Sequence, residues 1–193
     1  MQCIFYLGLF VGTLFVSTVA HGENPIVVIE TTKGTFKVEL FADKAPITVK
    51  NFLTYVDDKH YDGTIFHRVI ADFMIQGGGY TPGMVERKTR LPIKNEAGNG
   101  LSNKRGTIAM ARTSDPDSAT AQFFINVVDN PNLDRTESQA GYCVFGRVVE
   151  GMEVVDRIRN VPTTDVQKAG RPRWEAVPIE DIVIRSVRRL TQK

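Results

Sequence analysis

Arg68 is the residue whose surroundings in the sequence most need a chemical explanation. It lies in an otherwise apolar, strand-like run at residues 66–70, and the next run ends at Gln76, just before glycines 77–79. A guanidinium among apolar side chains is unfavourable unless a partner compensates its charge. Arg68 therefore has either a buried carboxylate partner or a ligand that binds beside it. The choice between these two readings decides what the protein does.

The residues around Arg68 combine large apolar side chains with amides. Alternation along a strand places Met74 and Gln76 on one face, and it places Gln122 and Phe124 on one face of a later strand. A site built in this way would bind an apolar ring and orient an amide beside it. The alternative is that Gln76 and Gln122 are ordinary polar groups at strand edges, bonded to loop backbone.

Other kinds of reactive chemistry have less support. His67 has no serine or cysteine partner in a G-x-S-x-G motif, and alternation points it away from Arg68. These features favour a structural histidine over a hydrolase base. Glycines 77–79 lack the lysine and the serine or threonine of a phosphate-binding loop, so we expect a turn there. His60 follows a predicted helix and is expected to cap its C-terminus.

The elements that must position these residues are mostly short strands. Apolar runs and alternation predict strands at residues 26–30, 36–40, 64–70, 73–76, 107–111, 122–127, 143–148 and 179–187. Helical spacing predicts an amphipathic helix over 46–59 and a short helix after Gly151. The irregular stretch 77–106 holds nine glycines and prolines, and stretches of this length tend to be functional or mobile. Together these elements predict a mainly β protein that forms a closed antiparallel barrel.

Length and composition describe a single domain of ordinary globular content. The chain has 193 residues, of which 42% are hydrophobic and 24% charged, and its net charge is +2. A charge this small gives no strong attraction to DNA or to acidic lipid. The basic residues near the C-terminus have no aromatic residues among them, so we expect a solvated edge there and no nucleic-acid site. These residues are Arg185, Arg188, Arg189 and Lys193.

The N-terminus differs from the rest of the chain. Residues 1–22 contain no Lys, Arg, Asp or Glu, and an apolar run extends from 4 to 16. This pattern predicts a secretory signal peptide cleaved after Ala20 or Gly22, which leaves a domain of residues 23–193. A retained membrane anchor is the alternative, since the run is near the lower length limit for a spanning helix. Cleavage would leave Cys143 as the single cysteine, which excludes an intramolecular disulfide and a cysteine metal site.

Five sequence blocks, in order along the chain, carry a family resemblance. They read FHRVI, FMIQGG, GTIAMA, QFFI and VFGRV, at residues 66–70, 73–78, 106–111, 122–125 and 144–148. The chain from 26 to 187 resembles the cyclophilins, a family of peptidyl-prolyl cis-trans isomerases, and is most similar to their periplasmic bacterial branch. The resemblance implies a closed eight-stranded antiparallel β-barrel capped by two α-helices. It also implies an exported enzyme that accelerates X-Pro bond rotation during the folding of secreted proteins.

The resemblance also implies roles for individual residues. Arg68 matches the catalytic arginine of the family, and Ala111 matches a position whose backbone flanks the substrate. Gln76 and Gln122 match the amides that hydrogen-bond the substrate. Tyr142 stands where the family usually has a histidine. The positions that match the proline pocket are Phe73, Met74, Phe124 and Leu133.

Two positions depart from the family pattern. Asn132 stands where many cyclophilins have a tryptophan associated with tight cyclosporin binding, so we expect weak cyclosporin affinity with catalysis retained. Arg112 stands where an asparagine is common, and because the family uses the backbone there, we expect the change to tune substrate preference. The loop at 134–141, just before Tyr142, is longer than in short eukaryotic forms.

The remaining expectations concern partners and location. No cofactor or metal ion is expected, and the expected partners are proline-containing unfolded or partly folded polypeptides. We expect a monomer in the periplasm, without nucleic-acid binding and without stable membrane association after cleavage. The alternatives are secretion, or membrane anchoring if the signal is retained. Two other functions stay open, a peptide-binding or chaperone module without catalysis and a small barrel for another ligand. Arg68 argues against pure binding, because a proline pocket alone needs no such cation.

Overall fold

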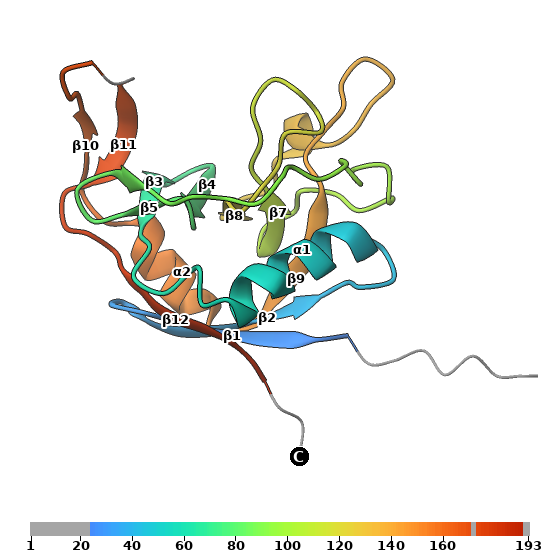
Figure 1. The fold of residues 1–193 in the computed structure, drawn as a ribbon, viewed down its shortest axis with the longest axis horizontal. Helices are drawn as coiled ribbons and strands as arrows, with labels where there is room; N and C mark the ends of the chain where they lie inside the picture. Colours follow the sequence, from blue (N-terminus) through green and yellow to red (C-terminus); the bar gives the residue numbers. More distant parts are fainter. Residues whose placement is uncertain (1–23, 171–172, 191–193) are drawn as a thin grey trace, which may run out of the picture.

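The computed structural model describes residues 24–170 and 173–190. The predicted signal peptide at 1–22 lies outside the described residues. Within the described part of the chain, no helix is long and apolar enough to span a membrane. The chain folds around one eight-stranded sheet with two helices, and a two-stranded hairpin stands up at one side (Figure 1).

The main sheet is antiparallel at every pairing. Its strands, in spatial order, are β12 (Ile184–Arg189), β1 (Ile26–Thr31), β2 (Gly34–Leu40), β9 (Val144–Glu150), β7 (Thr107–Met110), β8 (Phe123–Asn126), β4 (Met74–Gly77) and β3 (Phe66–Ile70). All eight strands correspond to predicted strand segments, because an apolar run or apolar alternation marks each of them. The prediction of a mainly β protein with two helices is confirmed.

The prediction of a closed barrel was wrong, since the sheet is an open half-barrel that ends at β12 and β3. The isolated bridge between Ile65 and Val183 joins the two ends, together with a bond of 2.8 Å from the backbone N–H of Gly63 to the carbonyl oxygen of Ile184. In the antiparallel register of this bridge, β12 lies opposite residues 59–63, which form turns after the first helix. Strand β3 lies opposite the residues just before β12, which include a bend. Neither strand therefore finds an extended partner, and no ladder closes the sheet.

The two helices begin as the sequence indicates. Helix α1 (Pro46–Asp57) has proline in its first turn and buries Val49, Phe52 and Leu53. It ends two residues earlier than predicted, at Asp57. Helix α2 (Met152–Arg159) follows Gly151, whose φ of 80° favours glycine and whose added Cβ would lie 2.7 Å from a backbone oxygen.

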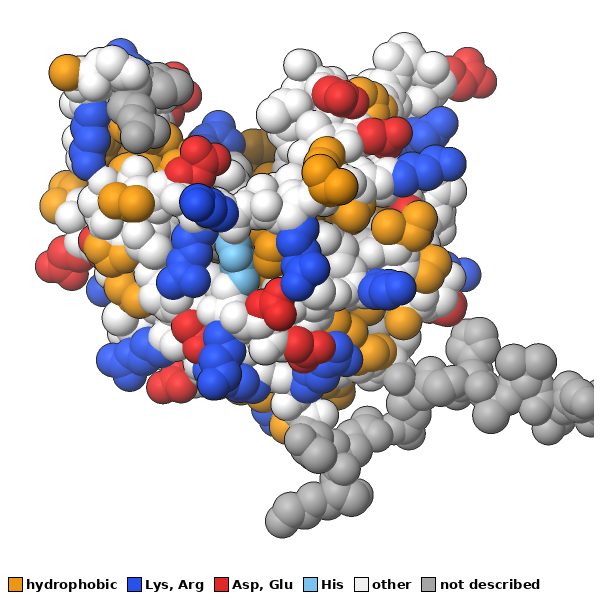
Figure 2. All heavy atoms as spheres, viewed as in Figure 1, with side chains coloured by type: hydrophobic (Ala, Val, Ile, Leu, Met, Phe, Trp, Pro, Cys, Tyr) orange, Lys and Arg blue, Asp and Glu red, His pale blue; other side chains and the backbone are white. Residues whose placement is uncertain are grey.

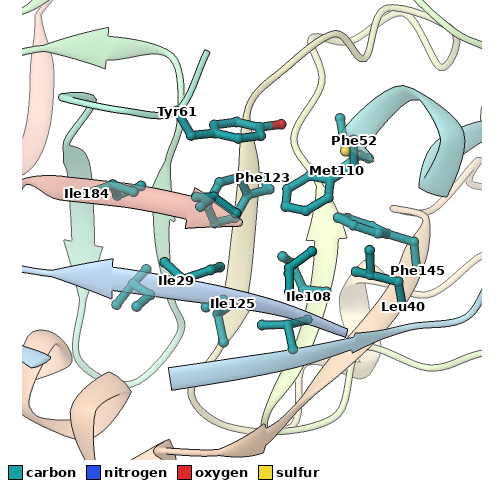
Figure 3. Close-up of a cluster of buried hydrophobic side chains, with 14 of the residues drawn as sticks. Ile29, Leu40, Phe52, Tyr61, Ile108, Met110, Phe123, Ile125, Phe145 and Ile184 are labelled. Carbon is teal, nitrogen blue, oxygen red and sulfur yellow. The ribbon is translucent and has the colours of Figure 1, made fainter. Parts of the chain in front are cut away.

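Both helices share one core with the sheet. Figure 3 shows Phe52 from α1 facing Phe123 and Phe145 from the sheet, and these rings contact one another edge-on or tilted. Strand β8 is buried on both faces. Phe123 and Ile125 pack into this core, whereas Phe124 packs into a second, smaller cluster with Met74, Ala109 and Val144. The second cluster forms the floor of the candidate site.

The sequence did not reveal three short elements. One is the hairpin of β10 (Thr163–Val166) and β11 (Trp174–Pro178), and another is the hairpin of β5 (Tyr80–Thr81) and β6 (Val85–Glu86). The third is a 3-10 turn, η1 (Pro131–Leu133). These segments lack the apolar alternation of the main strands. The last strand was predicted at 179–187 but begins only at Ile184. The residues before it form a bend and then the isolated bridge of Val183 with Ile65.

Candidate active site

Strand register brings the predicted site residues into one row. Arg68 on β3 pairs with Gln76 on β4, Gln76 pairs with Phe124 on β8, and Phe124 pairs with Ala109 on β7. Directly opposite residues in antiparallel strands lie on the same face of the sheet. The cation, the amide and the aromatic ring therefore face one hollow across three neighbouring strands.

A pocket of about 180 Å³ opens at this row. Nine of the ten predicted site residues line it: Arg68, Phe73, Met74, Gln76, Ala111, Arg112, Phe124, Leu133 and Tyr142. The tenth, Gln122, lines the neighbouring pocket together with Arg68 and Gln76. The structure thus gathers in one place residues that lie up to 74 positions apart, from 68 to 142.

Arg68 is partly buried at the edge of this pocket. Among the described residues, no carboxylate or other acceptor bonds its guanidinium. The sequence offered two readings of Arg68, a buried carboxylate partner or a ligand. The described chain holds no such carboxylate partner. The guanidinium keeps its hydrogen-bond donors for a group that enters the pocket.

His67, the neighbour of Arg68, is buried with 5% of its surface exposed. Burial lowers the pKa of His67 to about 4, with a smaller contribution from the charge of Arg68, against a hydrogen bond to the backbone of Ile65. The ring is therefore neutral near pH 7, and it packs edge-on against Tyr80 with centroids 4.7 Å apart. Its Nδ1 has no hydrogen-bond partner in the described structure, so the ring is buried as expected but not fully bonded.

His60 does not cap α1 as predicted. The C-terminal cap is Asp58, and the His60 Nε2 instead lies 3.3 Å from the carbonyl oxygen of Gly78. The His60 ring packs against Tyr55 and Tyr61. His60 therefore ties the end of the helix to the glycine loop after β4.

The apolar part of the pocket is closed by a segment distant in sequence. Met74 and Phe124 are almost fully buried in its floor, with 2% and 4% of their surfaces exposed. Leu133 comes from η1, and its carbonyl oxygen accepts a bond of 2.9 Å from the backbone N–H of Tyr142. The Tyr142 ring stands edge-on to Phe124, with centroids 5.7 Å apart. The pocket is therefore apolar at its base and framed by backbone hydrogen bonds.

A network of buried amides holds this wall, and sequence reasoning missed it. Asn130 Nδ2 donates to the carbonyl oxygen of Phe73 at 2.8 Å and to Asn126 Oδ1 at 2.7 Å. Asn126 donates to Asn103, which donates to Asp134 at 2.9 Å. The three asparagines are at most 5% exposed. Bonded buried amides fix the geometry of their surroundings, so this network positions Phe73 and η1. The polar Asn126 within an apolar strand was the available signal.

Gln76 and Gln122 form a pair across the edge of the pocket. Gln76 Nε2 donates to Gln122 Oε1 at 2.9 Å, so the amides bond each other and not loop backbone. Gly79 makes room for this arrangement, because a Cβ at that position would lie 2.5 Å from the Gln122 side chain. The backbone N–H of Ala111 donates to the carbonyl oxygen of Gln122 at 3.0 Å. The alternative reading of these glutamines as loop-bonded edge groups is therefore wrong.

Arg112 differs from Arg68 in being fully engaged. Its Nε and Nη2 each donate to the carbonyl oxygen of Gly141 at 3.1 Å, and its Nη1 donates to Thr113 at 2.8 Å. Its Cζ lies 4.4 Å from the centre of the Tyr142 ring. Arg112 thus braces the 141–142 segment that closes the pocket.

Cys143, the residue after Tyr142, is a buried and unactivated thiol. Burial raises the pKa of the Cys143 thiol to about 11, and the thiol is 3% exposed, so it stays protonated. In the described part of the chain, no three His, Cys, Asp or Glu side chains cluster in a way that could hold a metal ion.

Comparison with known proteins agrees with this arrangement. Residues 26–189 match the family described as cyclophilin-type peptidyl-prolyl cis-trans isomerase. The chain is 51% identical over 182 residues to a peptidyl-prolyl cis-trans isomerase of Acinetobacter baylyi, covering 94% of this chain and 96% of that protein. It is 55% identical over 166 residues to peptidyl-prolyl cis-trans isomerase B of Escherichia coli, covering 84% and 98%.

A solved structure has the same fold. The cyclophilin-type isomerase of Cryptosporidium parvum, crystallised in the presence of the dipeptide Ala-Pro, superposes with a TM-score of 0.73 at 29% identity. The match covers 86% of this chain and 99% of that structure.

Proposed function

Because this chain belongs to the cyclophilin-type peptidyl-prolyl cis-trans isomerases, we propose that Arg68 catalyses the rotation of X-Pro bonds bound in its pocket. The observation that carries this proposal is a guanidinium without a described partner beside a pocket of about 180 Å³ with an apolar base. A proline ring suits that pocket, since Phe73, Met74, Phe124 and Leu133 give it apolar walls. The Ala-Pro dipeptide named with the related C. parvum structure is the smallest X-Pro unit and supports the same assignment.

The chemistry requires no bond to be made or broken other than hydrogen bonds. Resonance in the X-Pro amide creates a rotation barrier of roughly 18 to 20 kcal/mol. In the twisted transition state that resonance is lost, and the prolyl nitrogen becomes pyramidal with a localised lone pair. A cation that donates a hydrogen bond to this nitrogen helps only there, because the planar amide nitrogen is a poor acceptor. The interaction therefore stabilises the transition state selectively.

Arginine suits this role because it stays charged and presents donors in a fixed fork. Rotation on the millisecond timescale requires an acceleration on the order of 10⁴ to 10⁵, which corresponds to about 5.5 to 7 kcal/mol. One hydrogen bond from a charged donor contributes about 1.5 to 3 kcal/mol. Orientation must supply the rest. We assign this task to the pocket, which holds the proline ring, and to Gln76, Gln122 and the backbone at Ala111, which hold the flanking chain.

The test is an isomerisation assay without a coupled protease on a blocked X-Pro peptide. Arg68→Ala should lower kcat/KM roughly 10-fold to 150-fold, which corresponds to losing about 1.5 to 3 kcal/mol of transition-state stabilisation. Arg68→Lys keeps the charge without the fork and should recover only part of the loss. Activity of Arg68→Ala within about twofold of the wild type would refute the role of the guanidinium.

We further propose that the enzyme is exported, acts in the periplasm and assists the folding of secreted proteins. This rests on the uncharged, apolar residues 1–22, which are typical of a signal peptide. N-terminal sequencing of protein expressed with its native start should show a chain that begins at His21 or Glu23. A chain that retains Met1 and stays in the membrane fraction would instead identify an anchor.

We also propose a monomer with weak cyclosporin affinity. Asn132 is exposed at the rim, where it gives no large ring for an apolar ligand to pack against. Asn132→Trp should therefore bind cyclosporin at least about tenfold more tightly than the wild type in an inhibition titration. Nanomolar inhibition of the unmodified protein would show that Asn132 does not limit affinity.

A further inference from the structure

A second pocket, of about 250 Å³, lies between the Arg68 edge of the site and the β10–β11 hairpin. We call it the hairpin pocket, and its lining residues are His67, Arg68, Gln76, Tyr80, Gln122, Arg173, Trp174 and Glu175. In Figure 1 the hairpin stands beside β3, and Figure 2 shows the surface hollowed next to it. Neither the rotation chemistry nor the proline pocket accounts for this feature.

Three aromatic rings line this pocket, those of His67, Tyr80 and Trp174. Tyr80 lies edge-on to His67 and to Trp174, with ring centroids 4.7 and 6.3 Å away. Trp174 is only partly buried, so part of its indole faces the pocket. Behind the rings, Ile65 and Val177 form a buried apolar cluster that supports Trp174. The rings are therefore held in place and do not need to be ordered by a ligand.

The hairpin pocket adjoins the proline pocket, because Arg68 and Gln76 line both. Consecutive residues of an extended chain advance by roughly 3.3 to 3.6 Å. A polypeptide whose proline occupies the first pocket therefore has a flanking residue within reach of the second. Because the two pockets adjoin, we take the occupant of the hairpin pocket to be another part of the same substrate chain.

The charges of the pocket favour an aromatic side chain over an acidic one. Arg173 is already ion-paired with Asp165, and Glu175 would repel an incoming carboxylate. His67 carries no charge near pH 7, so it acts as a ring and not as a cation. Arg68 also lines this pocket, and its guanidinium can stack on the face of an aromatic ring.

We propose that the hairpin pocket binds an aromatic side chain located within three residues of the isomerised proline. The proposal rests on the proposed function, because it requires a proline-containing chain in the neighbouring pocket. It gives the enzyme a preference that the proline pocket alone does not provide, and it assigns the β10–β11 hairpin a role in substrate selection.

The test uses blocked peptides with one proline and alanine elsewhere, into which one phenylalanine is placed at each of the three positions on either side. For the wild type, at least one position should raise kcat/KM roughly threefold to tenfold over the all-alanine peptide. In Trp174→Ala the ratio of kcat/KM for the phenylalanine peptide to kcat/KM for the all-alanine peptide should fall to about one. Trp174→Leu keeps an apolar contact with the cluster behind it and should also lose the ratio, which separates loss of the ring from loss of the hairpin.

Fluorescence gives an independent readout, since Trp174 is the single tryptophan of the chain. The preferred phenylalanine peptide should change its emission saturably, whereas its alanine counterpart should not. A wild-type ratio of about one at every position, or a ratio retained in Trp174→Leu, would overturn the proposal. These outcomes are separate from failure of the Arg68 mechanism, which is measured on the all-alanine peptide.

Discussion

The two walls of the proline pocket differ in how fully their polar groups are bonded. The Arg68 wall consists of β3 with His67 and Arg68, and in the described structure the Arg68 guanidinium and the His67 Nδ1 have no hydrogen-bond partner. The Arg112 wall consists of residues 111–112 and 126–142, where Arg112 makes three bonds to carbonyl oxygens and the buried asparagines bond one another. This difference indicates that one wall is a rigid frame and that the other presents its cation to the substrate.

Acid should destabilise the Arg68 wall through His67. Burial holds the pKa of His67 at about 4 in the folded protein, below the value of about 6.5 in an unfolded chain. The unfolded chain therefore binds a proton first, so this contribution to stability is complete above about pH 6.5 and is lost as the pH falls toward 4. The loss should be about 2.5 kcal/mol between pH 7.5 and 4.5, measured by urea unfolding at the two pH values.

His67→Phe is the matched control, because it keeps a ring and removes the titration. Burial also lowers the pKa of His60, so the variant should keep part of the pH dependence. An equal loss of stability in the wild type and in His67→Phe would show that His67 is not the group responsible.

On the Arg112 wall, Asn130→Ala should weaken the frame. It removes the amide that bonds Phe73 and leaves the buried Oδ1 of Asn126 without that donor. The expected cost is about 1 to 3 kcal/mol of unfolding free energy, together with a higher KM. Asn132→Ala, two residues away and exposed, should change stability by less than about 0.5 kcal/mol. Similar losses in both variants would mean that the network does not support the wall.

The edge between the two walls should be sensitive to Gly79→Ala. The added Cβ would meet the Gln122 side chain at 2.5 Å and force it away from Gln76. We expect KM to rise roughly threefold to tenfold, as for the loss of about one hydrogen bond to the substrate. Gly98→Ala is the control, since its nearest neighbour would lie at 3.7 Å. Unchanged kinetics in Gly79→Ala would show that the paired amides do not orient the substrate.

Arg112→Ala should have the smallest effect, because Arg112 acts on Tyr142 and the backbone of Gly141. The expected result is a rise in KM of no more than about threefold, with kcat unchanged, as for a residue that contributes equally to ground-state and transition-state binding. Steady-state kinetics across peptides with different residues before proline would also reveal the expected change in preference. A large fall in kcat would contradict the view that this wall is only a frame.

Much of this architecture could be predicted from local patterns in the sequence. The face shared by Met74 and Gln76, and that shared by Gln122 and Phe124, follow from alternation, and register then aligns Gln76 with Phe124. The sequence could not predict that the barrel stays open, because closure depends on which residues face β12 and β3 in space. The bonds of Asn130 to Phe73 and of Gln76 to Gln122 also join residues distant in sequence. The β10–β11 hairpin escaped prediction because its strands carry no apolar alternation.

The contrast between the two arginines can be measured on a single peptide. Under the mechanism proposed for Arg68, Arg68→Ala lowers kcat/KM roughly 10-fold to 150-fold, mainly through kcat, whereas Arg112→Ala lowers it by no more than about threefold. Arg68→Ala should unfold at the wild-type urea concentration, since Arg68 loses no described hydrogen bond. Arg112→Ala should unfold at a lower urea concentration, because it removes the bonds to the carbonyl oxygens of Gly141 and Thr113. Equal losses in the two variants, or an Arg68→Ala enzyme within about twofold of the wild type, would contradict the assignment of catalysis to the unpartnered guanidinium.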